Sequence, residues 1–232
     1  MSLFVAGIRA ANRRASNARA GQADIVTALP TGAGAIMSAS VARILGGLLY
    51  YPPDSAAAEP FLAALTRLPE LNEWPEEDEI PYWCRVLHLT TEDKAYSFRV
   101  LFTAPEQGLA PVPPWGSVYQ DPENRLNTGS TERYRIFLQA QQLTLQHAAD
   151  EPEDHIGLML LTLAYLLEQE REEAVMELLR EHLLPWSWRF VQLLQQATEG
   201  DFYPALSRIL GGFLAELEYQ LEICLPMIRL YR

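Results

Sequence analysis

The feature that most constrains this chain is a nearly continuous apolar run from Ile156 to Leu167, broken only by Gly157 and Thr162. A helix that is apolar on every side has no face to offer to water, so other elements must cover it. The run has twelve residues, whereas a membrane-spanning helix needs about 20. The sequence therefore predicts a buried central helix.

Several other segments have the spacing of helices that could cover this central one. Between residues 38 and 51, the apolar Val41, Ile44 and Leu48 recur three and four positions apart, as on one face of a helix. The same spacing predicts helices at 55–67, 78–89, 91–102, 130–146, 171–183, 186–198 and 202–224. No segment shows a convincing strand alternation, so we predict an all-α fold with a single helical bundle domain at 38–232.

Composition fits one soluble domain without a cofactor. The 232 residues are 49% hydrophobic, and this is too apolar for a disordered chain. The only two cysteines, Cys84 and Cys224, lie far apart in the sequence and form no Cys-x-x-Cys pair. This predicts neither a disulfide framework nor a zinc motif, and it favours a reducing cytoplasm.

The first 37 residues are predicted to form a flexible N-terminal extension. They are rich in Ala, Gly, Arg and Ser and show no sustained period. The pair Arg13-Arg14 is not followed by the apolar stretch of a secretory signal. An organellar transit peptide is the less favoured alternative, and Met37 is a credible natural start.

Charge limits the class of partner. The net charge is −12, and residues 38–232 alone carry −15 because the extension is basic. A body of that sign repels nucleic acid phosphates and anionic lipid headgroups and attracts basic ligands. We therefore expect no nucleic acid partner and no stable membrane insertion, whereas a cationic peptide is a plausible ligand.

The usual catalytic motifs are missing from the sequence. The segment Thr31-Gly32-Ala33-Gly34 lacks the Lys-Ser/Thr ending of a phosphate-binding loop. The four histidines include no pair four residues apart, and there is no Gly-x-Ser-x-Gly elbow. The sequence therefore predicts a protein that is not an enzyme and holds no metal.

A near-duplicate pair of segments contains adjacent glycines inside predicted helices. Arg43-Ile44-Leu45-Gly46-Gly47 is matched by Arg208-Ile209-Leu210-Gly211-Gly212. Glycine inside a helix costs about 1 kcal/mol relative to alanine, so a compensating close helix approach is favoured over ligand contact.

The stretch 104–122 holds five prolines and is predicted to be a long ordered loop. Within it, Pro113-Pro114-Trp115-Gly116-Ser117-Val118-Tyr119 combines a stiff backbone with two aromatic rings. Such rings supply apolar area and cation–π faces to a bound peptide. Trp115 could equally anchor the loop onto the core, and the sequence leaves both readings open.

A second unusual segment, Glu151-Pro152-Glu153-Asp154-His155, directly precedes the central helix. A capped helix N-terminus explains the proline and the acids. It does not require His155 or so dense a charge beside an apolar helix. A binding role is therefore equally open.

Six motifs together resemble one known family, and they cover the chain from about residue 42 to 232. They are Arg43-Ile44-Leu45-Gly46 with Tyr50-Tyr51, Phe98-x-x-Leu101-Phe102, Pro113 to Tyr119, Glu151 to Gly157, His182 to Phe190, and Phe202-Tyr203. The chain resembles the TorD/DmsD family of cytoplasmic chaperones, which mature twin-arginine-exported molybdoenzymes. Segment 1–37 has no counterpart in this family.

The resemblance implies an all-helical protein whose groove binds the twin-arginine signal peptide of a molybdoenzyme catalytic subunit, of the dimethyl sulfoxide reductase type. Binding would hold export back until the molybdenum cofactor is loaded. The twin-arginine translocase is a second candidate partner. The groove residues implied are Arg43, Tyr50, Phe98, Leu101, Phe102, Trp115, Gly116, Tyr119, Asp154 and His155.

Three positions depart from the family pattern. Phe98 and Tyr119 stand where the family has tryptophan, and Ala104 stands where it has glycine. The lost indole N–H donors could change leader selectivity, so the exact client stays open.

The expected mechanism joins both lines of reasoning. An acidic body would steer the basic end of the leader, and an apolar groove with aromatic walls would hold the remainder. Asp154 would pair with a leader arginine, and His155 would orient Asp154 or make binding pH-sensitive. Three rival functions remain: a helical adaptor for a folded reductase domain, a guanine-nucleotide-dependent enzyme, and a general chaperone for apolar segments.

Overall fold

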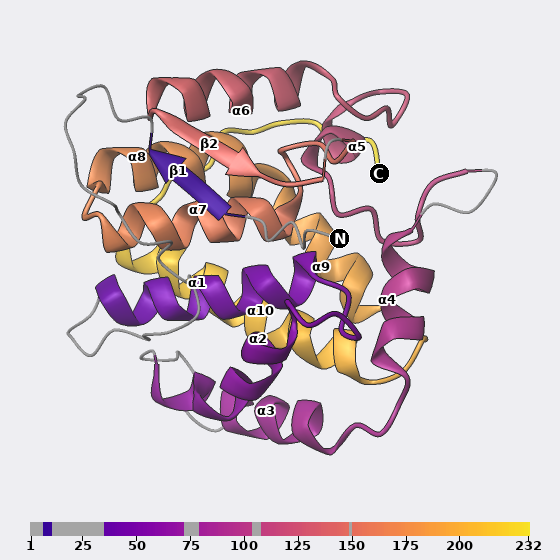
Figure 1. Cartoon of the computed structure of the whole chain (residues 1–232). Coiled ribbons are helices and arrows are strands. Elements are labelled where there is room, and N and C mark those ends of the chain that lie inside the picture. Colours follow the sequence, from indigo (N-terminus) through magenta and orange to yellow (C-terminus); the bar gives the residue numbers. More distant parts are fainter. Residues whose placement is uncertain (1–6, 11–34, 72–78, 104–107, 149) are drawn as a thin grey trace.

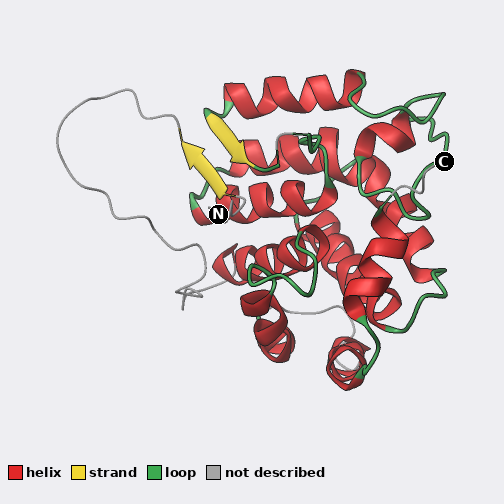
Figure 2. Ribbon diagram, turned by 45° about the vertical axis from the view of Figure 1, so that its right-hand side comes forward, coloured by secondary structure: helices red, strands yellow, loops and turns green. Residues whose placement is uncertain are grey.

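The computed structural model describes residues 7–10, 35–71, 79–103, 108–148 and 150–232 (Figure 1). Helices dominate this part of the chain, so the predicted all-α class is confirmed (Figure 2). Among the helices described, none has both the length and the apolarity to cross a membrane.

Two antiparallel helices, α1 (Ala35–Tyr50) and α7 (Ile156–Glu168), form the centre of the molecule (Figure 1). The residues of α7 from Ile156 to Ala164 are all buried, which confirms the predicted central helix. The two helices approach closely where glycines face each other: a Cβ on Gly46 would lie 2.9 Å from the carbonyl oxygen of Gly157. On Gly47 it would lie 2.4 Å from the Phe61 ring. Both observations support packing as the reason for this glycine pair.

Short helices from the first half cover one side of this pair. They are α2 (Glu59–Ala64), the 3-10 helix η1 (Leu65–Glu70), α3 (Glu79–Leu89) and α4 (Lys94–Phe102). Asp93 caps α4, because its side chain accepts a hydrogen bond from the Tyr96 amide at 3.0 Å.

The second half supplies the other cover. It contains α5 (Gly116–Gln120), α6 (Gly129–Ala140), α8 (Glu172–Glu177), the π-helix η2 (Leu178–Leu183), α9 (Leu184–Gln195) and α10 (Phe202–Gln220). Helix α10 packs against α3 and α9. Pro185 lies in the first turn of α9, where its missing N–H costs no helix hydrogen bond.

The structure corrects three sequence-based expectations. The helix predicted at 130–146 ends at Ala140, because Gln142 takes a positive φ of 56° that an α-helix cannot continue through. The following strand β2 (Leu143–Gln146) pairs antiparallel with β1 (Gly7–Ala10), so the expectation of no strands was wrong. The predicted loop 104–122 contains the short helix α5, and its residues 104–107 lie outside the described residues.

Strand β1 lies within the segment predicted to be a flexible extension. Its register pairs Gly7 with Gln146 and Ala10 with Leu143. Residues 1–6 and 11–34 lie outside the described residues, so flexibility of the extension stays a prediction.

Residues 223–232 follow α10 without regular secondary structure and end beside α5 (Figure 1). We call them the C-terminal strap.

Candidate functional site

The site is built where the proline-rich loop meets the N-terminus of α7. Trp115 and His155 form an isolated antiparallel bridge. The Gly116 amide donates to the Asp154 carbonyl at 3.0 Å, and the Ile156 amide donates to the Pro114 carbonyl at 2.7 Å. These bonds join the two segments that the sequence singled out.

Asp154 caps α5 rather than its own helix. Its Oδ2 accepts a hydrogen bond from the Ser117 amide at 2.5 Å, and the residue is only 1% exposed. Burial raises the pKa of Asp154, and the neighbouring Ser117 and Thr131 oppose that shift. Its Oδ1 has no hydrogen-bond partner among the described residues. A buried acceptor without a donor is costly. The Ser117 and Thr131 hydroxyls also lack partners among the described residues and lower the pKa of Asp154, so they compete with a ligand for this oxygen.

His155 caps α7. Its Nδ1 accepts a hydrogen bond from the Gly157 amide at 3.0 Å, which requires the other ring nitrogen to carry the proton. Burial lowers the pKa of His155 to about 3, so the ring is neutral at pH 7. The capped N-terminus expected from sequence is therefore present, but His155 makes the cap. The hydrogen bond to Oδ2 of Asp154 comes from the Ser117 amide and not from His155.

The Trp115 cluster consists of Tyr50, Trp115, Glu151 and His155. The His155 ring lies edge-on to Tyr50 at 5.2 Å and to Trp115 at 6.1 Å between centroids. Trp115 Nε1 donates to Glu151 Oε1 at 2.5 Å. Burial raises the pKa of Glu151, although the hydrogen bond from Trp115 opposes this. Tyr50, Trp115 and Glu151 are half-buried, so a ligand can reach them.

The Tyr119 group consists of Phe102, Tyr119, Trp186 and Phe190, and it is closed. Tyr119 is fully buried, stacks on Trp186 at 5.2 Å and donates from its hydroxyl to the Pro113 carbonyl at 2.8 Å. A Cβ on Gly116 would lie 2.7 Å from Trp186 Nε1, so Gly116 is needed for close packing. Tyr119 and Gly116 therefore shape the loop from within the core.

The three predicted residues of α4 extend the Tyr119 group. Phe102 lies 5.1 Å from Phe98 between ring centroids, and Leu101 accepts a hydrogen bond from the Val112 amide at 2.9 Å. Leu101 and Phe102 are buried, whereas Phe98 is half-buried at the edge.

Arg43 lies apart from the other predicted residues. Its guanidinium pairs with Glu168 at 2.6 Å, at the end of α7 opposite His155. A helix of 13 residues is about 20 Å long, so Arg43 does not belong to the Trp115 cluster.

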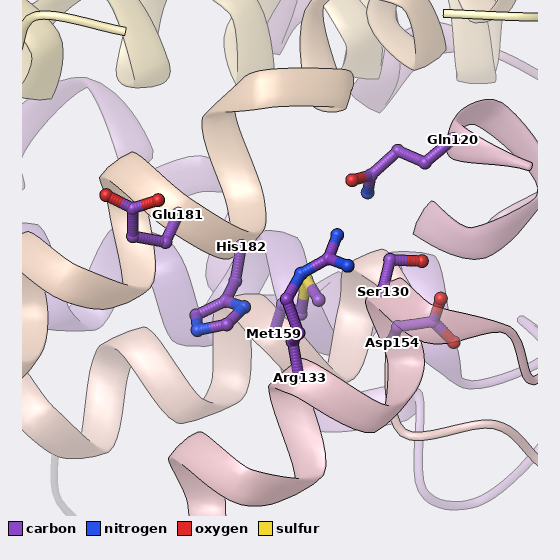
Figure 3. Close-up of a pocket in the computed structure, with 7 residues that line it drawn as sticks. All are labelled: Gln120, Ser130, Arg133, Asp154, Met159, Glu181 and His182. Atoms are coloured by element: carbon purple, nitrogen blue, oxygen red, sulfur yellow. The ribbon is translucent and has the colours of Figure 1, made fainter. Parts of the chain in front are cut away.

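A small pocket, with room for about one water molecule, lies beside Asp154 (Figure 3). Its lining comes from α5, α6, α7, η2 and the Asp154 segment: Gln120, Ser130, Arg133, Asp154, Met159, Glu181 and His182. Ser130 Oγ, like Asp154 Oδ1, has no hydrogen-bond partner among the described residues. In Figure 3 these two side chains lie on one side of the pocket, with Arg133 between them and His182.

The sequence did not predict this pocket. Its residues come from segments separated by up to 62 positions, from Gln120 to His182, so no single local motif defines it. Burial and the nearby Arg133 charge lower the pKa of His182 to about 4 although Glu181 opposes them, so His182 is neutral at pH 7. Within the described part of the chain, no group of three His, Cys, Asp or Glu could hold a metal ion.

A helical protein with a half-buried aromatic cluster and a buried carboxylate has elements that a peptide-binding chaperone needs. The chain belongs to the nitrate reductase delta subunit family, which includes the TorD/DmsD chaperones and whose model matches residues 64–192.

Similar proteins carry chaperone names. The chain is 35% identical to the probable Tat proofreading chaperone DmsD of Haemophilus influenzae, over 82% of this chain and 94% of that protein. It is 34% identical to the Tat proofreading chaperone DmsD of Salmonella typhimurium, over 84% and 95%. It is 28% identical to the chaperone protein YcdY of Escherichia coli, over 78% and 93%. These comparisons confirm the prediction of a chaperone rather than an enzyme.

Proposed function

We propose that this protein binds the twin-arginine signal peptide of a molybdoenzyme catalytic subunit and supports its folding, cofactor loading and export proofreading. Relatives named Tat proofreading chaperone are similar to this chain over nearly their whole length, and this similarity supports the proposed function. A cytoplasmic location, a client of the dimethyl sulfoxide reductase type and contact with the translocase belong to the same proposal.

The structural observation that carries the proposal is the buried Asp154 carboxylate, which lines a small pocket and whose Oδ1 has no hydrogen bond among the described residues. The pocket would have to widen to admit a leader arginine, which would then donate to that oxygen and favour the ionised form of a carboxyl whose pKa burial raises. Arg133 lines the same pocket, so its guanidinium would swing outward to avoid like-charge contact.

The Trp115 cluster would receive the apolar part of the leader. Tyr50 and Trp115 offer half-buried rings around His155, and the stiff loop loses little entropy on binding. The net charge of −12 would speed encounter with the basic end of the leader.

Capture of reductase catalytic subunits tests this function. The full chain is immobilised and offered three matched subunits: one with its leader, one without it, and one with the paired arginines replaced by lysines. We expect retention of the first, little of the second and weaker retention of the third. Equal retention of the leaderless subunit would favour the adaptor that binds a folded domain. Equal retention of the lysine form would favour a general chaperone for apolar segments.

A further inference from the structure

The C-terminal strap is fastened to the proline-rich loop by its last two residues. The Tyr231 amide donates to the Tyr119 carbonyl at 2.9 Å. Arg232 Nη2 donates to the Ala110 carbonyl at 2.9 Å and to the Pro111 carbonyl at 2.8 Å. Arg189 Nε in turn donates to the Arg232 carbonyl at 2.9 Å.

Apart from Ile223, which is 7% exposed and belongs to the core, the strap is weakly buried. Met227 is fully exposed, Ile228 is 40% exposed and Tyr231 is 38% exposed, whereas Leu225 and Leu230 are only partly buried against the core. A segment with few buried apolar contacts opens at low cost compared with the global unfolding of a protein. The hydrogen bonds of Tyr231 and Arg232 to the loop therefore decide whether the strap stays bound to it, which we call closed.

The chemistry of the strap matches that expected of the leader. From Leu225 to Arg232 it contains apolar residues, two arginines and no acid, although the body is strongly acidic. The Arg232 guanidinium already donates hydrogen bonds to two backbone carbonyls in the loop that carries Trp115. Asp154 caps the start of α5, and the strap is bound to the Tyr119 carbonyl near the end of the same helix.

We propose that the carbonyl groups of Ala110, Pro111 and Tyr119 form a second docking site for the basic part of the leader, and that the C-terminal strap occupies it in the free protein. This inference rests on the proposed function. The leader displaces the strap when it binds, so its apparent affinity is reduced by the fraction of molecules in which the strap is closed.

Two variants with the same charge change test the displacement. Arg232→Gln removes the guanidinium that contacts the loop. Arg229→Gln removes an exposed guanidinium that lies over the Tyr231 ring within the strap. A fluorescent peptide with paired arginines and an apolar stretch is titrated into each full-length variant. We expect Arg232→Gln to bind about fivefold or more tightly than Arg229→Gln, because competition from the strap is lost. Equal or weaker binding would overturn the inference and make the strap a brace that supports the loop.

A second experiment measures the docking site without the leader. A chain ending at Leu230 is titrated with a labelled synthetic peptide of residues 225–232, and with the same peptide carrying glutamine in place of Arg232. Saturable binding of the first and at least fivefold weaker binding of the second would support the site, and no difference would overturn it. If no variant binds the leader peptide but the strap peptide still binds, the proposed function is wrong. The docking site would then bind the strap but not a leader. If the shortened chain does not fold in a thermal melt, competition between the two peptides and the leader on the full chain gives the same comparison.

Discussion

Trp115 and Tyr119 lie four residues apart in one motif, yet they belong to different environments. Trp115 is half-buried and its indole bonds to Glu151 in the Trp115 cluster, which a ligand can reach. Tyr119 has no exposed surface and stacks on Trp186 inside the Tyr119 group. The difference arises because Trp115 precedes α5 with an extended backbone, φ −108° and ψ 130°, whereas Tyr119 lies within the helix. Aromatic residues in one motif therefore need separate tests for binding and for packing.

The largest effect should come from the closed side of this comparison. Tyr119→Ala should lower the free energy of unfolding by about 3 to 5 kcal/mol, because it leaves a cavity against Trp186. Tyr119→Phe is the matched control. It removes only the hydrogen bond to Pro113 and should cost about 1 kcal/mol. Denaturant unfolding measures both values. A small loss of stability in Tyr119→Ala together with lost leader binding would show that Tyr119 contacts the leader.

Trp115→Ala tests the open side. It should weaken leader binding by about 2 kcal/mol or more, as expected for an interface hot spot, with a smaller loss of stability. Fluorescence titration with the leader peptide and a thermal melt give the two quantities. Early melting with normal affinity in the surviving folded fraction would show that Trp115 mainly anchors the loop.

The pH dependence of stability tests the histidine that links the cluster to α7. Burial lowers the pKa of His155 to about 3 from its ordinary 6.5. The unfolded state therefore binds the proton first, and the stability contribution that is complete above pH 6.5 is lost as pH falls toward 3. His155→Asn keeps a capping side chain but does not titrate, so it should remove a slope of up to about 1.4 kcal/mol per pH unit.

The control for this pH experiment is His88→Asn, since His88 is exposed on α3. Unfolding free energies are compared between pH 7 and 4.5 for both variants and the original chain. Asp154, whose pKa is raised, contributes the opposite slope in all three proteins and cancels in the comparison. An unchanged slope in His155→Asn would show that His155 is not buried as a neutral ring.

The smallest effect should follow removal of the N-terminal segment. A chain starting at Met37 loses β1 and the first two residues of α1, yet retains the described body from Met37 onward. We expect a change in melting temperature of no more than about 2 °C, corresponding to about 0.5 to 1 kcal/mol for a protein of this size, and the same leader affinity. A loss of several degrees would show that the pairing of β1 with β2 supports the fold.

Local patterns predicted the elements better than the contacts between them. The apolar run of α7 identified the central helix, because burial on all sides leaves no polar face. The missed strand β2 depended on the left-handed conformation of Gln142, a residue type that gives little warning of it. The capping of α5 by Asp154 joins residues 37 positions apart, so no local motif could reveal it.

The resemblance supplied candidate site residues, and the structure separates them by position. Tyr50, Trp115 and His155 meet in one cluster, and Asp154 lies directly beside it. Arg43 is paired with Glu168 at the far end of α7, which spacing along the sequence could not show. The binding role of all ten residues stays a prediction.

The most direct test of the account is titration of a fluorescent twin-arginine leader peptide into Asp154→Asn at low and high salt. Asparagine can still accept the hydrogen bond from the Ser117 amide, so α5 should keep its cap and stability should fall by no more than about 1 kcal/mol. We predict that affinity falls about tenfold or more at low salt, and that the difference shrinks as salt rises. Glu70→Gln, at an exposed acid on η1, is the control for the change in net charge. Equal affinity of Asp154→Asn and Glu70→Gln at low salt would contradict the account and remove Asp154 from the leader site.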